Sequence, residues 1–220
     1  MIHKSIEKVL KEKDLARNAD RAGRPHRFSP SSFGRCYRLQ YWNRKAEPIS
    51  DPPDTKGMMK MAEGTKTHEM VQSYLPKEVV EVEILTDDVK GYADIVTEDC
   101  VYDIKTCDEW QFKRYWRIPT DKAVLAKSSN FLQVCWYALE LKKKYACIIG
   151  WIKGTLREEC RVEHKIEAME FYPQLVEELD TLRMFWLKEE LPPAVPRAFG
   201  GYDCNYCNWR TKCKELEHGK

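Results

Sequence analysis

The chain has 220 residues, of which 43% are hydrophobic and 33% charged, so it can form one sizeable core with an appendage and a charged surface. Its formal net charge is only +2, so overall charge gives no argument for nucleic-acid binding, and any basic surface must be local. No stretch is long and apolar enough to cross a bilayer and the start lacks the apolar core of a signal peptide, so we expect a cytoplasmic protein without a membrane partner, in the host cytoplasm if it is viral.

The first part of the chain is predicted to be helical. The spacing of apolar residues indicates an amphipathic helix over residues 4–20, followed by a basic linker over residues 21–30 that glycine and proline interrupt. A second helix is expected to begin at a cap formed by Ser31 or Ser32. It would carry Phe33, Cys36, Tyr37, Leu39 and Tyr41.

A break at residues 51–54, Asp-Pro-Pro-Asp, precedes the middle of the chain. A third helix is predicted over residues 58–75, with Thr55 as its cap and Pro76 after its end. Three short segments rich in β-branched residues then predict strands at residues 79–85, 89–96 and 100–107.

The second half begins with residues 108–129, which look irregular and mixed in charge. Asn130 is expected to cap a helix that reaches about residue 144. Two more strands and one long helix are predicted before a cysteine-rich tail, at residues 146–155, 161–166 and 170–191.

This order of elements predicts an α/β or α+β fold with a central mixed sheet flanked by helices. We expect three parts. They are an N-terminal helical segment (1–57), a core (58–190) and a C-terminal cysteine-rich segment (191–220).

Residues 91–107 are predicted to form a hairpin that carries two acidic side chains. Asp94 lies on the first strand, and Asp103 and Lys105 lie two apart on the second, so these two share one face. In the expected register Asp94 approaches Asp103. Two carboxylates with a lysine beside them make a site for a divalent cation, although an Asp-x-Lys pair alone is ordinary on a solvated strand.

The helices on either side of the hairpin add weaker signals. His68 follows Gly64 by one turn on the preceding helix, where a lone histidine is more often a core or surface residue than a ligand. Gln133 and Tyr137 are four apart on the following helix and therefore share a face. They could line a substrate groove or form a half-buried polar pair at the edge of the sheet.

The ordered set of these motifs resembles the PD-(D/E)XK nuclease superfamily in its RecB-like branch. The motifs are Gly-x-x-x-His (64–68), Gly-x-x-Asp (91–94), Asp-x-Lys (103–105) and Gln-x-x-x-Tyr (133–137). The resemblance implies a restriction-endonuclease-like core. It also implies a metal-dependent DNA exonuclease that cuts phosphodiester bonds.

The resemblance further implies a role for each motif residue. His68, Asp94, Asp103 and the backbone carbonyl of Ile104 would hold Mn²⁺ or Mg²⁺, and Lys105 would orient the attacking water and stabilise negative charge. Gln133 and Tyr137 would position Lys105 or the DNA strand. Because an imidazole ligand is softer than oxygen, we expect Mn²⁺ to support activity at least as well as Mg²⁺.

The nine cysteines are many for such a chain, and their odd number fits poorly with complete disulfide pairing. Cys204, Cys207 and Cys213 lie within ten residues of one another, a spacing that favours a metal site over packing. A tetrahedral site needs a fourth thiolate, and Cys36 is the best candidate because it lies outside the core. The remaining five are interpreted as small core residues: Cys100, Cys107, Cys135, Cys147 and Cys160.

One upstream and three downstream cysteines resemble the CRISPR-associated iron–sulfur exonucleases and the nuclease domain of AddB-type helicase–nucleases. This implies a structural 4Fe-4S cluster on Cys36, Cys204, Cys207 and Cys213. A zinc ion on the same four thiolates is the alternative, which the spacing does not exclude.

The expected partner is DNA, single-stranded and cut from the 5′ end if the chain follows these relatives. Basic and aromatic residues mix within residues 108–129, with Lys113, Arg114 and Arg117 as candidate DNA contacts, and a solvated loop is the alternative. A second basic candidate consists of Arg21, Arg24, His26 and Arg27.

Two other functions stay open at this point. The chain could be a CRISPR adaptation factor that processes spacer precursors in a complex, or a cluster-bearing DNA-binding module without cleavage. No helicase motif is present, so any unwinding must come from a partner. Helicase, recombination or CRISPR adaptation proteins are the candidate partners.

Overall fold

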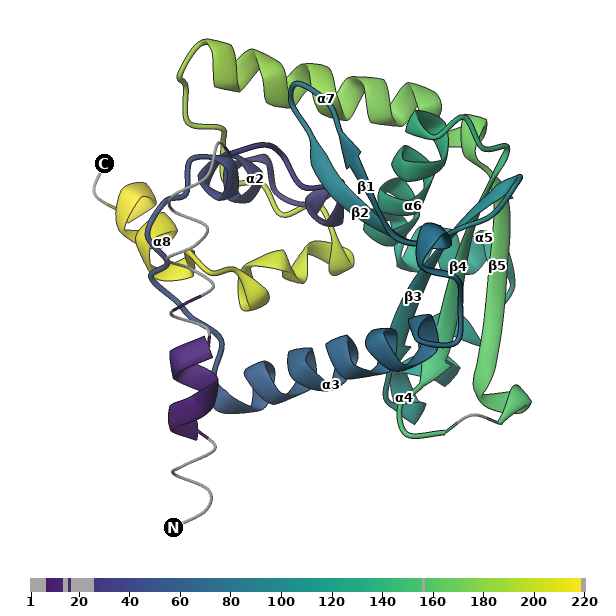
Figure 1. Cartoon of the computed structure of the whole chain (residues 1–220). Helices are drawn as coiled ribbons and strands as arrows, with labels where there is room; N and C mark the ends of the chain where they lie inside the picture. The colour runs from purple at the N-terminus through teal and green to yellow at the C-terminus, as the bar shows by residue number, and fades with distance from the viewer. Residues whose placement is uncertain (1–6, 14–15, 17–25, 156, 219–220) are drawn as a thin grey trace.

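The computed structural model describes residues 7–13, 16, 26–155 and 157–218. Within them a five-stranded sheet has the order β1-β2-β3-β4-β5, and β3 and β4 are parallel while the other neighbours are antiparallel (Figure 1). The strands are β1 (Val80–Leu85), β2 (Lys90–Val96), β3 (Cys100–Cys107), β4 (Tyr145–Ile152) and β5 (Arg161–Glu167). The predicted mixed sheet and the predicted strands are confirmed.

The parallel pair requires a crossover, since two parallel strands cannot be joined by a tight turn. The chain between β3 and β4 runs through α4 (Glu109–Gln111), a π-helical turn η3 (Phe112–Trp116), α5 (Thr120–Ala126) and α6 (Ser128–Glu140). The expectation that residues 108–129 are irregular is therefore wrong. Asp108 accepts a hydrogen bond from the Gln111 backbone N–H at 2.8 Å and starts the first turn.

The other helices are α2 (Tyr37–Arg44), α3 (Thr55–Gln72), α7 (Tyr172–Leu187) and α8 (Arg210–His218). Short 3₁₀ turns occur at η1 (Pro30–Ser32), η2 (Lys77–Val79), η4 (Glu158–Cys160), η5 (Ala168–Phe171) and η6 (Phe199–Tyr206). Residues 7–13 are helical as predicted, whereas most of the remaining predicted helix over 4–20 lies outside the described residues. No helix in the described part of the chain has the length and apolar character of a membrane span.

Three helix starts differ from the prediction. The cap of α3 is Asp54, whose Oδ1 accepts from the Gly57 N–H at 2.7 Å, because a carboxylate is a better acceptor here than the Thr55 hydroxyl. The early helix does not begin at Ser31 or Ser32, because Gly34 has φ +73°, a conformation that a helix cannot contain. Cys36 is instead the N-cap of α2. Helix α6 begins at Ser128 rather than after Asn130.

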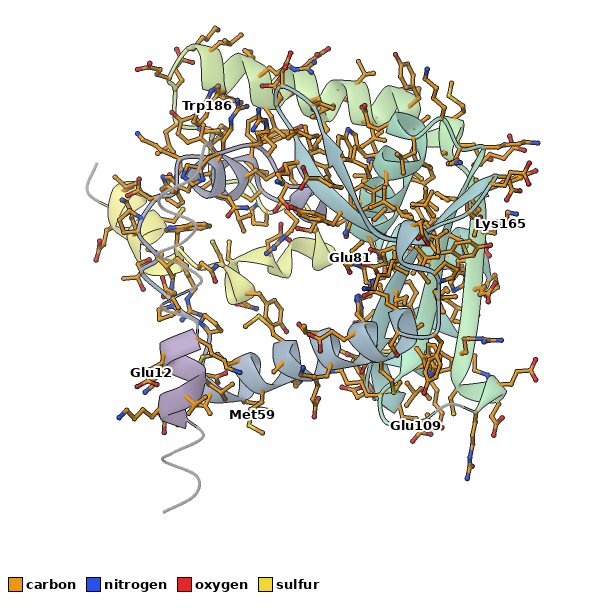
Figure 2. All side chains as sticks on the ribbon, viewed as in Figure 1. Glu12, Met59, Glu81, Glu109, Lys165 and Trp186 are labelled. Atoms are coloured by element: carbon orange, nitrogen blue, oxygen red, sulfur yellow. The ribbon has the colours of Figure 1, made fainter. Side chains whose placement is uncertain are left out.

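Most of the core surrounds α6, which lies between the sheet and α7 (Figure 1). A second core joins α2 to the segment before α8, and its buried members are Leu39, Tyr41, Trp42 and Trp209. Trp186 extends from α7 toward α2, where its ring centroid lies 5.5 Å from that of Tyr41 (Figure 2). Helix α2 and the segment before α8, which are far apart in the sequence, therefore pack against each other.

Candidate active site and cysteine site

The candidate active site lies where β2 and β3 separate. Their antiparallel register pairs Ile95 with Tyr102 and Val96 with Val101 and then ends, so Asp94 and Asp103 occupy the next positions along the two strands. Asp94 Oδ2 accepts a hydrogen bond of 2.7 Å from the Ile104 backbone N–H, which takes the place of a strand partner. Since the N–H and C=O of one strand residue point to the same side, the Ile104 carbonyl faces this edge as well.

Both acidic side chains are buried, with exposed fractions of 8% for Asp94 and 1% for Asp103. Burial raises the pKa of the Asp103 carboxyl; the positive charge of Lys105 opposes this rise and the negative charge of Asp94 adds to it. Asp103 Oδ2 lies 2.7 Å from Lys105 Nζ as an ion pair, and this oxygen has no further partner among the described residues. A buried carboxylate oxygen with unused lone pairs suits a bound cation.

Lys105 is held from helix α6. Its ammonium donates to Gln133 Oε1 at 3.1 Å, and Gln133 Nε2 in turn donates to the Tyr137 hydroxyl at 3.4 Å. Burial lowers the pKa of Lys105, but Asp103 and Asp94 raise it more strongly, so the net shift is upward. The ammonium therefore stays charged at neutral pH.

His68 reaches the site from α3. Its Nδ1 lies 3.4 Å from Asp94 Oδ2, and its side chain is 26% exposed. Burial lowers the pKa of His68, but the hydrogen bond and the charge of Asp94 outweigh burial and raise it overall. The structure thus brings together His68, Asp94, Asp103, Ile104, Lys105, Gln133 and Tyr137, which come from two strands and two helices.

Gln72 belongs to this site and was missed in the sequence. Its Nε2 donates to the Asp94 backbone carbonyl at 3.2 Å and to Glu81 Oε1 at 2.6 Å. Glu81 lies in β1 with φ +50°, a left-handed conformation that is uncommon for a residue other than glycine. The signal was available, because Gln72 follows His68 by four residues on the same helical face.

Gly91 links two of the motifs by shape. A Cβ atom at this position would lie 2.6 Å from the Tyr137 ring and 2.9 Å from its hydroxyl. Tyr137 therefore packs in the space that the glycine leaves open, so the first residue of Gly-x-x-Asp supports the last residue of Gln-x-x-x-Tyr. Gly64 differs, because a Cβ there would meet only Thr106 Oγ1 at an ordinary 3.6 Å.

The cysteine site lies between the start of α2, η6 and α8. A cavity of about 80 Å³ is lined by Cys36, Cys204, Cys207 and Cys213. Two sulfur atoms accept hydrogen bonds, Cys213 Sγ from Arg38 Nη1 at 3.3 Å and Cys207 Sγ from the Trp209 N–H at 3.4 Å. All nine cysteines are free thiols, and those interpreted as core residues are buried except Cys160, which is half-buried.

Two buried carboxylates hold this site together, and sequence reasoning missed both. Asp203 Oδ2 accepts from the Cys36 N–H and the Arg197 N–H, each at 3.2 Å, and its Oδ1 accepts from the Ala198 N–H at 2.8 Å. These bonds join the N-cap of α2 to the segment that carries Cys204. The position of Asp203 directly before Cys204 was the only signal in the sequence.

The second carboxylate belongs to Glu178 on α7. Glu178 Oε1 accepts from the Gly34 N–H at 3.0 Å and from Gln40 Nε2 at 2.7 Å, on both sides of Cys36. Its other oxygen, Oε2, accepts from Arg197 Nη1 at 2.7 Å. Glu178 is 1% exposed, so these partners take the place of water around its carboxylate oxygens.

As they stand, no three His, Cys, Asp or Glu side chains of the described residues are arranged as a metal site. The donor sets nonetheless suit metals of different kinds. Asp94 and Asp103 offer hard oxygen donors, one of which has only the Lys105 ammonium as a partner among the described residues, and oxygen donors suit Mg²⁺ and Mn²⁺. The cysteine site offers four thiols around one cavity with N–H groups on two sulfurs, which suits iron–sulfur or zinc ligation.

The predicted DNA contacts lie on the crossover between β3 and β4. Lys113, Arg114 and Arg117 are exposed, in or just after η3. In the second basic candidate, Arg27 donates to the backbone carbonyl of Thr86 at 2.8 Å and so anchors its own segment to the β1–β2 turn. Arg21 and Arg24 lie outside the described residues, and His26 is half-buried.

Comparison with solved structures finds the same fold in other proteins. A protein named SSO0001 matches 97% of this chain with 96% of its own, at TM-score 0.60 and 16% identity. A phage-related exonuclease from Haemophilus somnus 129PT matches 68% of this chain with 78% of its own, at TM-score 0.51 and 11% identity.

The alkaline exonuclease LHK-Exo from Laribacter hongkongensis matches 78% of this chain with 94% of its own, at TM-score 0.47 and 12% identity. No protein-family model matches the chain, and the search of curated proteins gave no match. At these identities the likeness shows the fold alone.

Proposed function

We propose that this chain is a metal-dependent DNA exonuclease of the PD-(D/E)XK type with a RecB-like site. The observation that carries the proposal is the meeting of His68, Asp94, Asp103 and Lys105 at the point where β2 and β3 separate. The fold shared with the phage-related exonuclease is consistent with this activity. The site, rather than the fold, is the reason to expect hydrolysis.

The residues that would hold a divalent cation are His68, Asp94, Asp103 and the carbonyl of Ile104. When bound, the cation supplies Lewis-acid stabilisation of a phosphate oxygen and lowers the pKa of a bound water. The burial of Asp103, whose Oδ2 has only the Lys105 ammonium as a partner among the described residues, and the edge-facing carbonyl of Ile104 support this assignment.

Lys105 acts as a cation in this proposal. Its ammonium is charged at neutral pH, so it can pair with a phosphate oxygen and stabilise the negative charge that grows during attack by water. Gln133 keeps the ammonium oriented, because its own amide is fixed by Tyr137. Asp103 holds the same ammonium from the strand.

For the cysteine site we propose a 4Fe-4S cluster with a structural role on Cys36, Cys204, Cys207 and Cys213. The cavity and the two N–H···S hydrogen bonds support a thiolate-bound group, and zinc is the rival. Freshly purified protein should be brown and contain about four irons per chain. Colourless protein with zinc and no iron would decide for the rival.

The proposed substrate is single-stranded DNA, cut from the 5′ end. The resemblance alone carries the strand type and the polarity, and a separate helicase would supply unwound DNA. We expect the protein to act in the cytoplasm of the cell that contains it.

The test is degradation of end-labelled single-stranded DNA with Mn²⁺ or Mg²⁺ by the wild type, Asp103→Ala and Lys105→Ala. We expect shortening from the 5′ end by the wild type and at least about 100-fold slower degradation by both variants. Equal degradation by all three proteins would reveal a contaminating nuclease and contradict the proposal. Binding without cleavage by the wild type would favour a DNA-binding module.

A further inference from the structure

A group of aromatic and basic side chains, the aromatic–basic patch, lies on the crossover between β3 and β4. It consists of Trp110, Arg114, Tyr115 and Lys127. The Arg114 guanidinium lies 5.4 Å from the Trp110 ring centroid and 5.5 Å from that of Tyr115. The Lys127 ammonium lies 4.0 Å from the Tyr115 ring centroid. Two cations and two rings thus form one contiguous surface.

The exposure of Trp110 is unusual for its size. Its side chain is 62% exposed, while Phe112 and Trp116, two and six residues further on, are fully buried in the core. The Trp110 and Tyr115 rings meet edge to face at 87°, with their centroids 6.0 Å apart, which leaves the Trp110 ring able to stack on another flat group. The core therefore does not account for Trp110.

The charge of Arg114 is also available. Lys113 is neutralised by Glu109 at 2.6 Å on the same helical segment. Arg114 differs, because none of the ion pairs between described residues includes it. A guanidinium that lies over aromatic rings and has no carboxylate partner can still form bidentate hydrogen bonds to a phosphate.

The patch lies close to the catalytic strand. Trp110 follows Lys105 by five residues, and α4 begins two residues after Cys107 at the end of β3. Lys127 is the N-cap of α6 and precedes Gln133 by six residues, which is about 9 Å along a helix. The Lys127 ammonium is near enough to Cys107 to oppose the rise that burial causes in the pKa of the Cys107 thiol. A strand bound at the patch would therefore be near Lys105.

We propose that the aromatic–basic patch binds unpaired DNA beside the active site, with a base stacked on Trp110 and neighbouring phosphates paired with Arg114 and Lys127. The inference rests on the proposed nuclease function and adds how the chain would select a single strand. Bases inside a duplex are already stacked on each other, so only an unpaired strand can offer a base to Trp110. A base–aromatic stack and a cation on the adjacent phosphate are the usual means of holding single strands.

The test measures binding of labelled oligothymidylate in EDTA by fluorescence anisotropy, in the full chain carrying Lys105→Ala so that no cleavage occurs. Adding Trp110→Ala should weaken binding by roughly 5- to 100-fold. Trp110→Phe should restore most of it because the ring remains. Leu125→Ala is the matched control, since Leu125 is 81% exposed on neighbouring α5 and should have no effect.

A duplex of equal length separates stacking from general attraction to phosphates. Trp110→Ala should change duplex binding by less than about threefold, whereas Arg114→Ala should weaken both forms and reduce the salt dependence. The proposal is overturned if Trp110→Ala binds single strands like its parent, weakens both forms equally, or has the same effect as Leu125→Ala.

The two proposals fail separately. If Trp110→Ala loses single-strand binding and the wild type does not cleave DNA, the DNA-binding role of the patch is supported and the proposed nuclease activity is refuted. If the wild type cleaves DNA and Trp110→Ala binds single strands as its parent does, the nuclease activity is supported and the DNA-binding role of the patch is refuted.

Discussion

The active site and the cysteine site differ in how the chain assembles them. In the active site the Asp94–Ile104 hydrogen bond spans ten residues of sequence, and the sheet sets its geometry. In the cysteine site the Cys36–Asp203 hydrogen bond spans 167 residues and joins the N-cap of α2 to the short 3₁₀ helix η6. A site built on neighbouring strands is positioned by their register, whereas a site built from distant segments needs additional side chains that hydrogen-bond the segments together.

The carboxylates of the two regions show this difference in their hydrogen bonds. Both oxygens of Glu178 and both oxygens of Asp203 accept hydrogen bonds. Asp103 is as deeply buried as either, yet its Oδ2 has only the Lys105 ammonium, at 2.7 Å, as a partner in the described part of the chain. Carboxylates with several backbone and side-chain donors suit structural roles, whereas one with a single partner keeps lone pairs that can bind another group.

The largest expected effect is on the active site alone. Lys105→Ala should slow DNA degradation by about 100-fold or more, because it removes the charge beside the reacting phosphate. The metal content of the cysteine site should not change. Timed degradation of labelled DNA and metal analysis check both statements.

Lys165→Ala is the control, because Lys165 is an exposed lysine on β5 (Figure 2). Its rate should match the wild type. Loss of iron or zinc in Lys105→Ala would contradict the independence of the two sites.

The cysteine site should govern stability instead. Cys204→Ala should release the bound metal and lower the midpoint of thermal unfolding by more than about 5 °C, since metal binding and folding are coupled at thiolate sites. EDTA should stop DNA degradation with little change in this midpoint. Differential scanning fluorimetry and metal analysis give the answer.

Cys160→Ala changes a half-buried cysteine outside the site and should keep both metal and midpoint. A Cys204→Ala variant as stable as the wild type, with its metal retained, would refute the assignment of the site.

A moderate effect on stability is expected at Glu178, the buried carboxylate on α7. Glu178→Gln should lower the free energy of unfolding by about 1.5–3 kcal/mol, because charged hydrogen bonds to Gly34, Gln40 and Arg197 are weakened. Urea unfolding measures the change. Glu177→Gln alters an exposed neighbour and should have almost no effect.

A double-mutant cycle with Arg197→Ala sharpens the comparison. The two changes should couple by at least about 0.5 kcal/mol. Additive effects would mean that Glu178 does not act through Arg197.

The smallest effect contrasts two glycines of the active-site motifs. Gly91→Ala should destabilise the protein by about 1–3 kcal/mol, because its Cβ would collide with the Tyr137 ring. Gly64→Ala should stabilise it by up to about 1 kcal/mol, because alanine favours a helix and the site has room. Urea unfolding of the two variants tests the pair, and equal effects would remove the role given to Tyr137.

The sequence predicted the regular parts better than the irregular ones. All five strands and the approach of Asp94 to Asp103 followed from alternation and hairpin spacing, because both depend on neighbouring residues. The 108–129 segment was mistaken for a loop, since its helicity comes from the tertiary burial of Phe112 and Trp116 rather than from a local pattern.

The residues that support each site through hydrogen bonds were harder to predict. Glu178 and Asp203 are ordinary acidic residues in the sequence, and only the folded chain brings them to Gly34 and Cys36. Gln72 differs, because it shares a helical face with His68 and its spacing was therefore a signal. Contacts between distant segments leave no periodic signal, so Glu178 and Asp203 could not be found from spacing alone.

The distance along the chain between Cys36 and the other three cysteines also has a consequence for synthesis. A ribosome adds roughly 5–20 residues per second, so the first thiol waits about 10–30 s for Asp203 and the residues after it to be made. The metal proposed for this site could therefore be loaded only after the sheet has been translated. Loading would then act as a checkpoint, because a prematurely terminated chain could never pass it.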